Sequence, residues 1–359
     1  MCKKGLLFIL VFAFAIQLSA QENQAEFEII TKLNHTPVIS QGSTGTCWSF
    51  ATTSFLESEI MRKGFPETDL SEMFFVYNAY LDKTEEYLLY HGNNNFSQGG
   101  QAHDVLNILK EKGMVLYDAY PGEKTDGRYN HRELVQELSD TVDELNKKRK
   151  NFTLTDIKPV VPVLKEKIGK LPNKVKTADG NFSPANFRDK FELNPEDYVE
   201  LTSYNHHHFY EQFVLEVPDN WSNDLYYNLP IDELMEVMTY SINNGYTIAW
   251  DGDTSEKTFN HKLGKADLPE KQIGKADQEL RQKTFFDRTT TDDHLMHIVG
   301  LSKDKSGRTC FYTKNSWGAD SNDFGGYLHM TEDYVRLKTI AILVHKNAIP
   351  NRIKAKLKL

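Results

Sequence analysis

The sequence predicts an α+β fold, because helical patterns come first along the chain and short strand patterns come later. The 359 residues are enough for one large domain or two modest ones. Hydrophobic residues make up 39% of the chain and charged residues 26%, as in ordinary globular proteins. The formal net charge of -9 argues against a nucleic-acid partner.

The first 20 residues have the pattern of a secretory signal peptide. Lys3 and Lys4 precede an apolar run over 6–18, and Ser19 and Ala20 are small enough for cleavage. Because a bilayer span takes roughly 20 apolar residues, the run favours cleavage over a lasting membrane anchor. We expect a mature chain, residues 21–359, that is exported to the periplasm or the extracellular space without a membrane span.

The first part of the chain predicts helices separated by polar turns. The apolar spacing that begins after Thr46 continues to Lys63, and Gly64 ends the helix. Over about 122–195 the apolar residues thin out, and one apolar stripe marks a long charged helix, so we interpret this stretch as a helical insertion. The expected elements are an N-terminal arm at 21–33, helices at 46–63, from about 69 and at 102–112, and a loop at 93–100.

The second part predicts short strands around one helix. These segments are rich in β-branched and aromatic residues, and some alternate polar with apolar positions. A basic tail without acidic residues ends the chain at 351–359. The expected strands are 212–217, 246–250, 295–301, 310–313, 327–330 and 339–345, with a helix at 231–243.

Cys47 stands where a glycine-rich turn meets the start of the first helix. Unpaired backbone N–H groups and the positive end of the helix dipole favour a thiolate there, and the thiolate is the nucleophile. We therefore expect an exposed, reactive Cys47 rather than an inert buried one, and no bridge to Cys310. Gln41 carries an amide donor that can stabilise an oxyanion together with the Cys47 N–H.

Two histidines, His294 and His297, lie three residues apart in a predicted strand. Side chains on a strand alternate between two faces, so only one of the two can face a shared cleft. His294 is the candidate base for the thiolate, and His297 is interpreted as a structural histidine. The same alternation disfavours a metal site formed by this pair.

The segment 312–318 supplies a partner for that base. The side-chain oxygen of Asn315 can accept the second ring N–H of His294, which fixes the tautomer and leaves the other nitrogen facing the sulfur. Trp317 can shield this hydrogen bond from water. Taken alone, the Asn-Ser-Trp-Gly run is also compatible with a turn.

In order and spacing, three motifs resemble those of the papain-like cysteine peptidases. They are Gln-x5-Cys-Trp-Ser-Phe-Ala around Cys47, His-Leu-Met at His294 with a glycine six residues after the histidine, and Asn-Ser-Trp-Gly at Asn315. Thr44 stands where many members carry a disulfide cysteine, so the chain departs from the main secreted branch.

Further segments are more similar to the bleomycin hydrolase and aminopeptidase C branch of that family. They are Gly99-Gly100-Gln101, the stretch 228–231 with the helix after it, and the stretch 247–253. The resemblance covers about 38–346 and is weak over 122–195.

This resemblance implies a two-lobed papain-like fold. Cys47 heads the central helix of the first lobe, while His294 and Asn315 come from the strand-rich second lobe. It further implies hydrolysis of peptide or protein substrates through an acyl-enzyme at Cys47, without a cofactor. Gln41 is then an oxyanion donor, and Gly99 and Gly100 line the substrate cleft.

The position of the cut within the substrate stays open. In the resembled branch the C-terminal carboxylate lies in the cleft and holds the free amine of the substrate, which makes those enzymes aminopeptidases. Here the tail 351–359 is basic and repels a protonated amine unless the carboxylate alone makes the contact. A frayed tail without a role is the alternative, and endopeptidase action is as compatible with the sequence.

Two other functions also stay open, a catalytically inactive binding domain and an amide deconjugase or transferase on the same fold. A homo-oligomer is compatible with the sequence. The histidine run 206–208 has no accompanying cysteine or carboxylate pattern, so a solvated run is favoured over a metal site. The carboxylates of Asp251, Asp253, Asp292 and Asp293 form either a negative patch near the cleft or a solvated loop.

Overall fold

The computed structural model describes residues 26–148 and 157–359, so the predicted signal peptide lies outside the described residues. The helices are α2 (Cys47–Arg62), α3 (Glu72–Leu89), α4 (Ala102–Glu111), α5 (Arg132–Lys147), α6 (Val160–Ile168), α7 (Pro184–Lys190), α8 (Ile231–Asn243), α9 (Gln278–Phe286), α10 (Glu332–Lys338) and α11 (Asn351–Leu357). The strands are β1 (Phe27–Lys32), β2 (Val175–Thr177), β3 (Gly180–Phe182), β4 (Tyr198–Thr202), β5 (Gln212–Val214), β6 (Leu225–Asn228), β7 (Ile248–Gly252), β8 (Phe259–Asn260), β9 (Lys265–Ala266), β10 (His294–Asp304), β11 (Thr309–Lys314), β12 (Tyr327–Thr331) and β13 (Thr339–His345).

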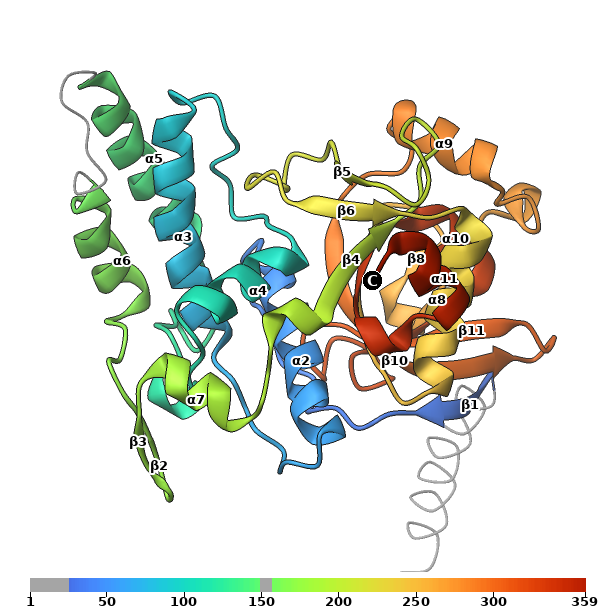
Figure 1. Ribbon diagram of the computed structural model, residues 1–359, viewed down its shortest axis with the longest axis horizontal. Helices are drawn as coiled ribbons and strands as arrows, with labels where there is room; N and C mark the ends of the chain where they lie inside the picture. Colours follow the sequence, from blue (N-terminus) through green and yellow to red (C-terminus); the bar gives the residue numbers. More distant parts are fainter. Residues whose placement is uncertain (1–25, 149–156) are drawn as a thin grey trace, which may run out of the picture.

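The first lobe is helical, with α2 between the outer helices and the sheet of the second lobe (Figure 1). Helix α2 is buried over nearly its whole length, and only its last two residues, Met61 and Arg62, are partly accessible. The side chain of Ser71 accepts the backbone N–H of Phe74 and so caps α3. The apolar stripe of α5 is buried against α3 and α6, and its members are Leu134, Leu138, Val142 and Leu145.

The second lobe is a mixed sheet of eleven strands within the described residues, with β13, β7, β10 and β11 at its centre. Side chains alternate across it as strand geometry requires. Leu295 and Ala249 face the core of the first lobe, whereas Met296 and Trp250 face a second core that includes α8. The sheet therefore separates the two cores, and its central strands carry residues into the junction between the lobes.

Most of the expected elements form, but four expectations need correction. The strand expected at 212–217 ends at Val214, and a tight turn from Leu215 to Val217 follows. The N-terminal arm, for which no strand was predicted, contains β1, which pairs with β10. The stretch 122–195 contains α5, α6 and α7, but also the hairpin of β2 and β3.

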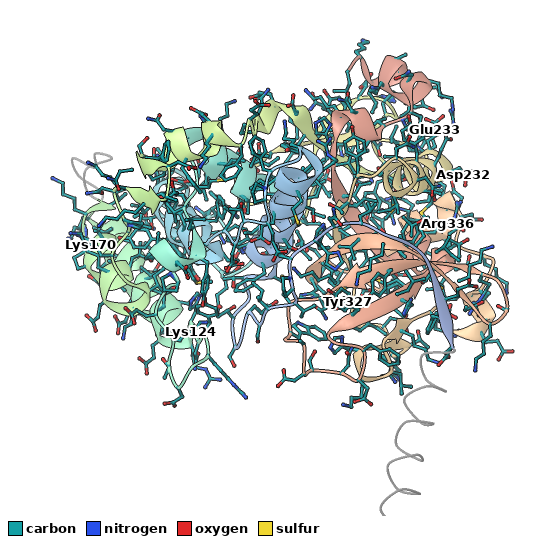
Figure 2. The ribbon with its side chains drawn as sticks, turned by 90° about the horizontal axis from the view of Figure 1, so that it is seen from below. Lys124, Lys170, Asp232, Glu233, Tyr327 and Arg336 are labelled. Carbon is teal, nitrogen blue, oxygen red and sulfur yellow. The ribbon has the colours of Figure 1, made fainter. Side chains whose placement is uncertain are left out.

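The fourth correction concerns the basic tail, which is a helix and not a frayed end. Ile353 and Leu357 of α11 are buried in the second core, with 0% and 3% of their surface exposed. Arg352 and Lys356 form ion pairs with Glu233 of α8. Figure 2 shows Glu233 beside Asp232 and Arg336, on one side of the second lobe. None of the helices in the described part of the chain is long and apolar enough to cross a bilayer.

Candidate active site

His294 and Asn315 lie at one end of the hairpin formed by β10 and β11. These strands pair antiparallel, so the first residue of β10 and the residue after β11 meet at the same end. Nε2 of His294 lies 2.8 Å from Oδ1 of Asn315. The backbone N–H of Ser316 donates to the same atom over 2.7 Å, which identifies it as the amide oxygen. His294 therefore donates from Nε2, and its Nδ1 is left as the proton acceptor.

The other end of the Asn315 amide contacts His261, a residue that the sequence analysis did not single out. Nδ2 of Asn315 lies 3.4 Å from Nδ1 of His261, and Nε2 of His261 lies 2.7 Å from the Ser321 hydroxyl. That hydroxyl donates to the Gly318 carbonyl, so it accepts from His261. The chain of donors and acceptors is thus consistent from Ser321 to His294. No motif marks His261, because it lies far from both partners in the sequence.

Trp317 covers this chain of hydrogen bonds from the solvent side. Its ring centroid lies 5.0 Å from that of His294 and 4.7 Å from that of His261. Trp317 itself remains 38% exposed. A large aromatic ring between water and a hydrogen bond lowers the local dielectric and strengthens that bond. This arrangement agrees with the shielding predicted for Trp317.

Helix α2 brings Cys47 to the same end of β10. The Ser54 hydroxyl contacts Nδ1 of His297 over 2.8 Å, which aligns the helix along the strand. From Ser54 back to Cys47 the helix covers seven residues, a rise of about 10 Å. From His297 back to His294 the strand covers three residues, also about 10 Å, so Cys47 and His294 lie at the same level. The Leu295 backbone is close enough to lower the pKa of the Cys47 thiol against the larger effect of burial, which agrees with this alignment. The thiol therefore lies beside the start of β10.

The prediction that Cys47 is exposed is wrong. The residue is only 8% exposed, because the second lobe covers the start of α2. Burial raises the pKa of the Cys47 thiol to about 12, and the carboxylates of Asp251, Asp292 and Asp219 act in the same direction. Burial likewise lowers the pKa of His294 to about 4. Each group alone is therefore neutral at pH 7, and desolvation outweighs the helix dipole.

Gln41 connects the turn before α2 to the hairpin of the second lobe. The Ser316 hydroxyl donates to Oε1 of Gln41 over 2.6 Å, and Nε2 of Gln41 donates to the Thr44 carbonyl over 2.8 Å. The Gln41 backbone N–H also donates to the Ser316 carbonyl. One N–H of the Gln41 amide is used in the turn, and the second is left for another acceptor.

Gly99 and Gly100 lie against the start of α2, as the resemblance implies for cleft residues. Trp48, next to Cys47, donates from its indole to the carbonyl before Gly99 over 2.9 Å. A Cβ atom at Gly100 would lie 3.0 Å from the Trp48 ring. A Cβ atom at Gly99 would lie 1.9 Å from Oδ2 of Asp219, so a larger residue there would displace the Asp219 carboxylate. The structure thus brings the predicted cleft residues together with Cys47.

The predicted acidic patch divides into two groups. Asp253 pairs with Lys338 over 2.9 Å, and Asp293 accepts the backbone N–H groups of Thr254 and Ser255. These two carboxylates therefore have partners within their own lobe. Asp251 and Asp292 are close enough to share a hydrogen bond with each other, on the side of the sheet that faces Cys47.

The remaining histidine predictions have different outcomes. His297 is buried against α2, on the opposite side from the His294–Asn315 contact, in agreement with a structural role. The statement that no carboxylate accompanies the run 206–208 is wrong, because Glu216 lies 3.1 Å from Nε2 of His206 and 2.6 Å from Nε2 of His207. The Gln282 amide donates to Nδ1 of His206. The Nε2 atom of His206 therefore carries the proton that Glu216 accepts. Cys47 and Cys310 are free thiols, as expected.

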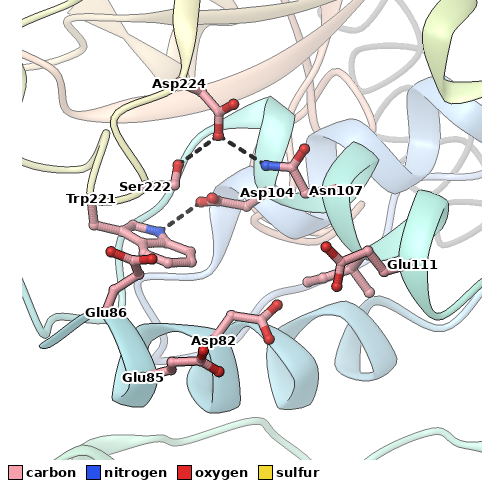
Figure 3. Close-up of a pocket in the computed structure, with 10 residues that line it drawn as sticks. Asp82, Glu85, Glu86, Asp104, Asn107, Glu111, Trp221, Ser222 and Asp224 are labelled. Carbon is pink, nitrogen blue, oxygen red and sulfur yellow. Dashed lines mark hydrogen bonds between the residues drawn. The ribbon is translucent and has the colours of Figure 1, made fainter. Parts of the chain in front are cut away.

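A separate acidic cavity of about 400 Å³ lies between α3 and α4 (Figure 3). The Trp221 indole donates to Asp104 across it over 2.9 Å, and the same oxygen accepts the Gln101 backbone N–H over 2.8 Å. Neither Cys47 nor His294 lines this cavity, so it is distinct from the candidate active site. Its carboxylates come from Asp82, Glu85, Glu86, Asp104, Glu111 and Asp224.

Comparisons with known proteins agree with this architecture. The family model described as Peptidase C1-like family matches residues 172–359, and the model described as Papain family cysteine protease matches residues 24–172. Aminopeptidase G of Lactobacillus delbrueckii subsp. lactis is 23% identical, over 88% of this chain and 82% of its own. The mitochondrial cysteine proteinase 1 of Saccharomyces cerevisiae is 23% identical, over 95% of this chain and 80% of its own. The crystal structure of PepW from Lactobacillus rhamnosis HN001 covers 100% of this chain and 95% of its own, with a TM-score of 0.73 and 16% identity, and shares the fold.

Proposed function

Because the chain belongs to the Peptidase C1-like family and is a cysteine peptidase, we propose that Cys47 is its nucleophile, His294 its base and Asn315 the residue that orients the base. The observation that carries this proposal is the 2.8 Å contact between His294 Nε2 and Asn315 Oδ1, at the strand end that the start of α2 approaches. It leaves Nδ1 of His294 as the only ring nitrogen able to accept a proton.

The proposed reaction begins with transfer of the Cys47 thiol proton to Nδ1 of His294. The thiolate attacks the carbonyl carbon of the peptide bond, while the Cys47 backbone N–H and the Gln41 amide stabilise the oxyanion. His294 returns the proton to the leaving amine, and the C–N bond breaks to give a thioester at Cys47. Water, deprotonated by His294, then hydrolyses the thioester and restores the thiol. No cofactor enters these steps.

The second thiol of the described chain offers a matched control. Cys310 is buried in β11 and lies outside the candidate site. We expect Cys47→Ala to abolish hydrolysis of a fluorogenic peptide and labelling by iodoacetamide at the active site, while Cys310→Ala retains both. Hydrolysis retained by Cys47→Ala and lost in Cys310→Ala would overturn the assignment. Product analysis by mass spectrometry separates hydrolysis from transfer to a second amine or release of a conjugated group.

We further propose that the enzyme acts as an aminopeptidase. The support is the name of a relative that spans most of the chain, aminopeptidase G. The test is a pair of peptides that differ only in an N-terminal acetyl group. Cleavage restricted to the free-amine peptide, one residue at a time, is expected, and equal cleavage of both within the chain would establish an endopeptidase.

We also propose that the enzyme is exported after removal of residues 1–20. The support is the basic start, the apolar run and the small residues at 19–20 in the sequence. N-terminal sequencing of the enzyme recovered from its native cells should begin at or near residue 21, in an extract of the cell envelope or the medium. An intact N-terminus in the cytoplasm would contradict the proposal.

A further inference from the structure

Two carboxyl groups that the proposed reaction does not use lie at the junction of the lobes beside Cys47. Asp251 in β7 pairs with Leu295 in β10, the residue after His294, so both side chains project from the same face of the sheet. Leu295 faces the first lobe. Asp292 precedes β10 by two residues, and its Oδ2 accepts the Gln101 side chain of the first lobe over 2.8 Å.

Asp251 lacks the partners that a buried carboxylate requires. It is 3% exposed, and neither of its oxygens accepts a hydrogen bond from a donor in the described part of the chain. Burial, together with the carboxyl of Asp292, raises its pKa well above the usual range. The two groups therefore share a proton in the free protein, since ionisation of Asp292 opposes ionisation of the buried, adjacent Asp251.

The pair lies where the two lobes meet. Asp292 is partly buried as a residue. Asp219, in the loop between β5 and β6, packs against Gly99 of the first lobe and is also partly buried. All three carboxyl groups are close enough to affect the Cys47 thiol electrostatically. A substrate that lies along Gly99 and reaches Cys47, as the resemblance implies, therefore lies near these carboxyl groups.

The residues around these three groups favour an organic cation over a metal ion. Asp219, Asp251 and Asp292, here called the acidic trio, are not among the clusters of described residues whose ligand atoms converge tightly enough for a metal. Lys83 is the strongest cation near Asp219, but its ammonium is engaged by the carbonyls of Ser97 and Gly99. The strongest charged neighbours of the Asp251–Asp292 pair are the carboxylates of Asp219, Asp293 and Glu200.

We propose that the acidic trio binds a protonated amine or a guanidinium of the substrate, next to the bond that Cys47 cleaves. This rests on the proposed function. The cation takes the place of the proton shared by Asp251 and Asp292, and that proton leaves to solvent. The cation is either the N-terminal ammonium of a short peptide or the side chain of a lysine or arginine. The first source would explain aminopeptidase action, and the second would select basic sequences.

This exchange of a proton for a cation predicts a pH dependence. Burial, then repulsion by Asp219, raises the pKa of Asp292 to about 7. Above that pH the Asp251–Asp292 pair carries an additional negative charge. The nearby groups that interact electrostatically with this charge are Asp293, Glu200 and Cys47. The preference for a lysine side chain, which stays protonated over this range, should therefore increase as the pH rises from 6 to 8 in the wild-type enzyme. The increase should be smaller for a free α-amine, which has an ordinary pKa of about 8 and loses part of its charge.

The experiment compares three fluorogenic amides that differ in the location of a positive charge. One is a dipeptide amide acetylated with lysine at the residue farther from the bond, one is the same dipeptide with norleucine there, and one is a single norleucine amide whose free amine lies on the residue next to the bond. We expect kcat/KM for one of the two cationic substrates to exceed that for acetyl-norleucine by tenfold or more. In Asp292→Asn and in Asp251→Asn this ratio should fall about tenfold, equivalent to about 1.4 kcal/mol. Asp323→Asn, at an exposed carboxylate paired with Lys262, should leave it unchanged.

The outcomes separate the two proposals. Preference for the lysine or for the free-amine substrate identifies the source of the cation. Cleavage of all three substrates at equal rates, or a ratio that is unchanged both in the two Asn variants and between pH 6 and 8, would overturn the acidic trio and leave the peptidase proposal intact. Failure of the wild-type enzyme to cleave any of the three, with Cys47 unreactive toward iodoacetamide, would overturn the proposed function itself.

Discussion

Shortening Ile353 to alanine tests what holds the C-terminal helix on the second lobe. Ile353 is fully buried, so its truncation removes apolar contacts and leaves a cavity. Such changes cost about 2–5 kcal/mol of unfolding free energy. Arg352, on the exposed side of the same helix, is 54% exposed and pairs with Glu233 and Glu236. Solvent screens such pairs, so Arg352→Ala should cost much less unfolding free energy than Ile353→Ala.

Urea unfolding at neutral pH, followed by circular dichroism, measures both differences. The reasoning is refuted if Arg352→Ala costs as much as Ile353→Ala, since charge would then hold the helix. The result also bears on deletion of 351–359, which removes Ile353 and Leu357 together. At about 1.5–3 kcal/mol for each buried side chain, the loss is about 3–6 kcal/mol, a large part of a typical domain's stability. Point variants are therefore a better probe of the tail than its deletion.

Three further predictions concern the junction between the lobes. His261→Ala should lower kcat about tenfold with little change in KM, because His261 positions Asn315 without touching the substrate. The variant His261→Gln should recover part of the lost kcat. An equal change in KM would contradict this role. Gln41→Ala should lower kcat by a factor of about 10²–10³ if the Gln41 amide stabilises the oxyanion. The unfolding free energy of the variant is measured as well, because the Ser316 hydroxyl loses its acceptor. An unchanged kcat would refute the oxyanion role. The pKa of Asp292 in the folded protein is about 7, above its usual value, so the stability it contributes is present at low pH and is lost as the pH rises from about 4 through 7. In Asp292→Asn the unfolding free energy measured with urea should decline less over this pH range. Parallel curves for the variant and the wild type would contradict the argument.

The elements that were predictable from sequence are those in which local pattern and tertiary packing agree. Helix α8 and strand β13 form over the residues expected, because their apolar periods match the faces they bury. The strand β4 was missed because all five of its residues are buried and polar residues interrupt its apolar ones. Helix α9 was missed because its buried residues include Arg281 and Gln282, which do not mark an apolar face.

For the candidate site, sequence reasoning selected residues that the structure brings together, but it did not predict their environment. The motifs around Cys47, His294 and Asn315 could be found from spacing alone, since each retains its local pattern. Burial of Cys47 could not, because the covering surface comes from a lobe some 250 residues later in the chain. The contact of Asp251 with Asp292 depends likewise on the pairing of β7 with β10, and no local pattern distinguishes these two from Asp253 and Asp293.

Burial of the thiol and imidazole changes how the candidate site is understood. A thiolate stabilised only by a helix dipole would persist without the second lobe, whereas here each group alone resists ionisation. Transfer of a proton from Cys47 to His294 creates two opposite charges together, and their attraction offsets part of the desolvation that each would face alone. That attraction depends on distance, and the distance depends on the contacts that join the lobes, Ser54–His297, Gln41–Ser316 and Gln101–Asp292. The third of these contacts belongs to the acidic trio, so a cation bound there acts on the same lobe junction that brings the thiol to its base.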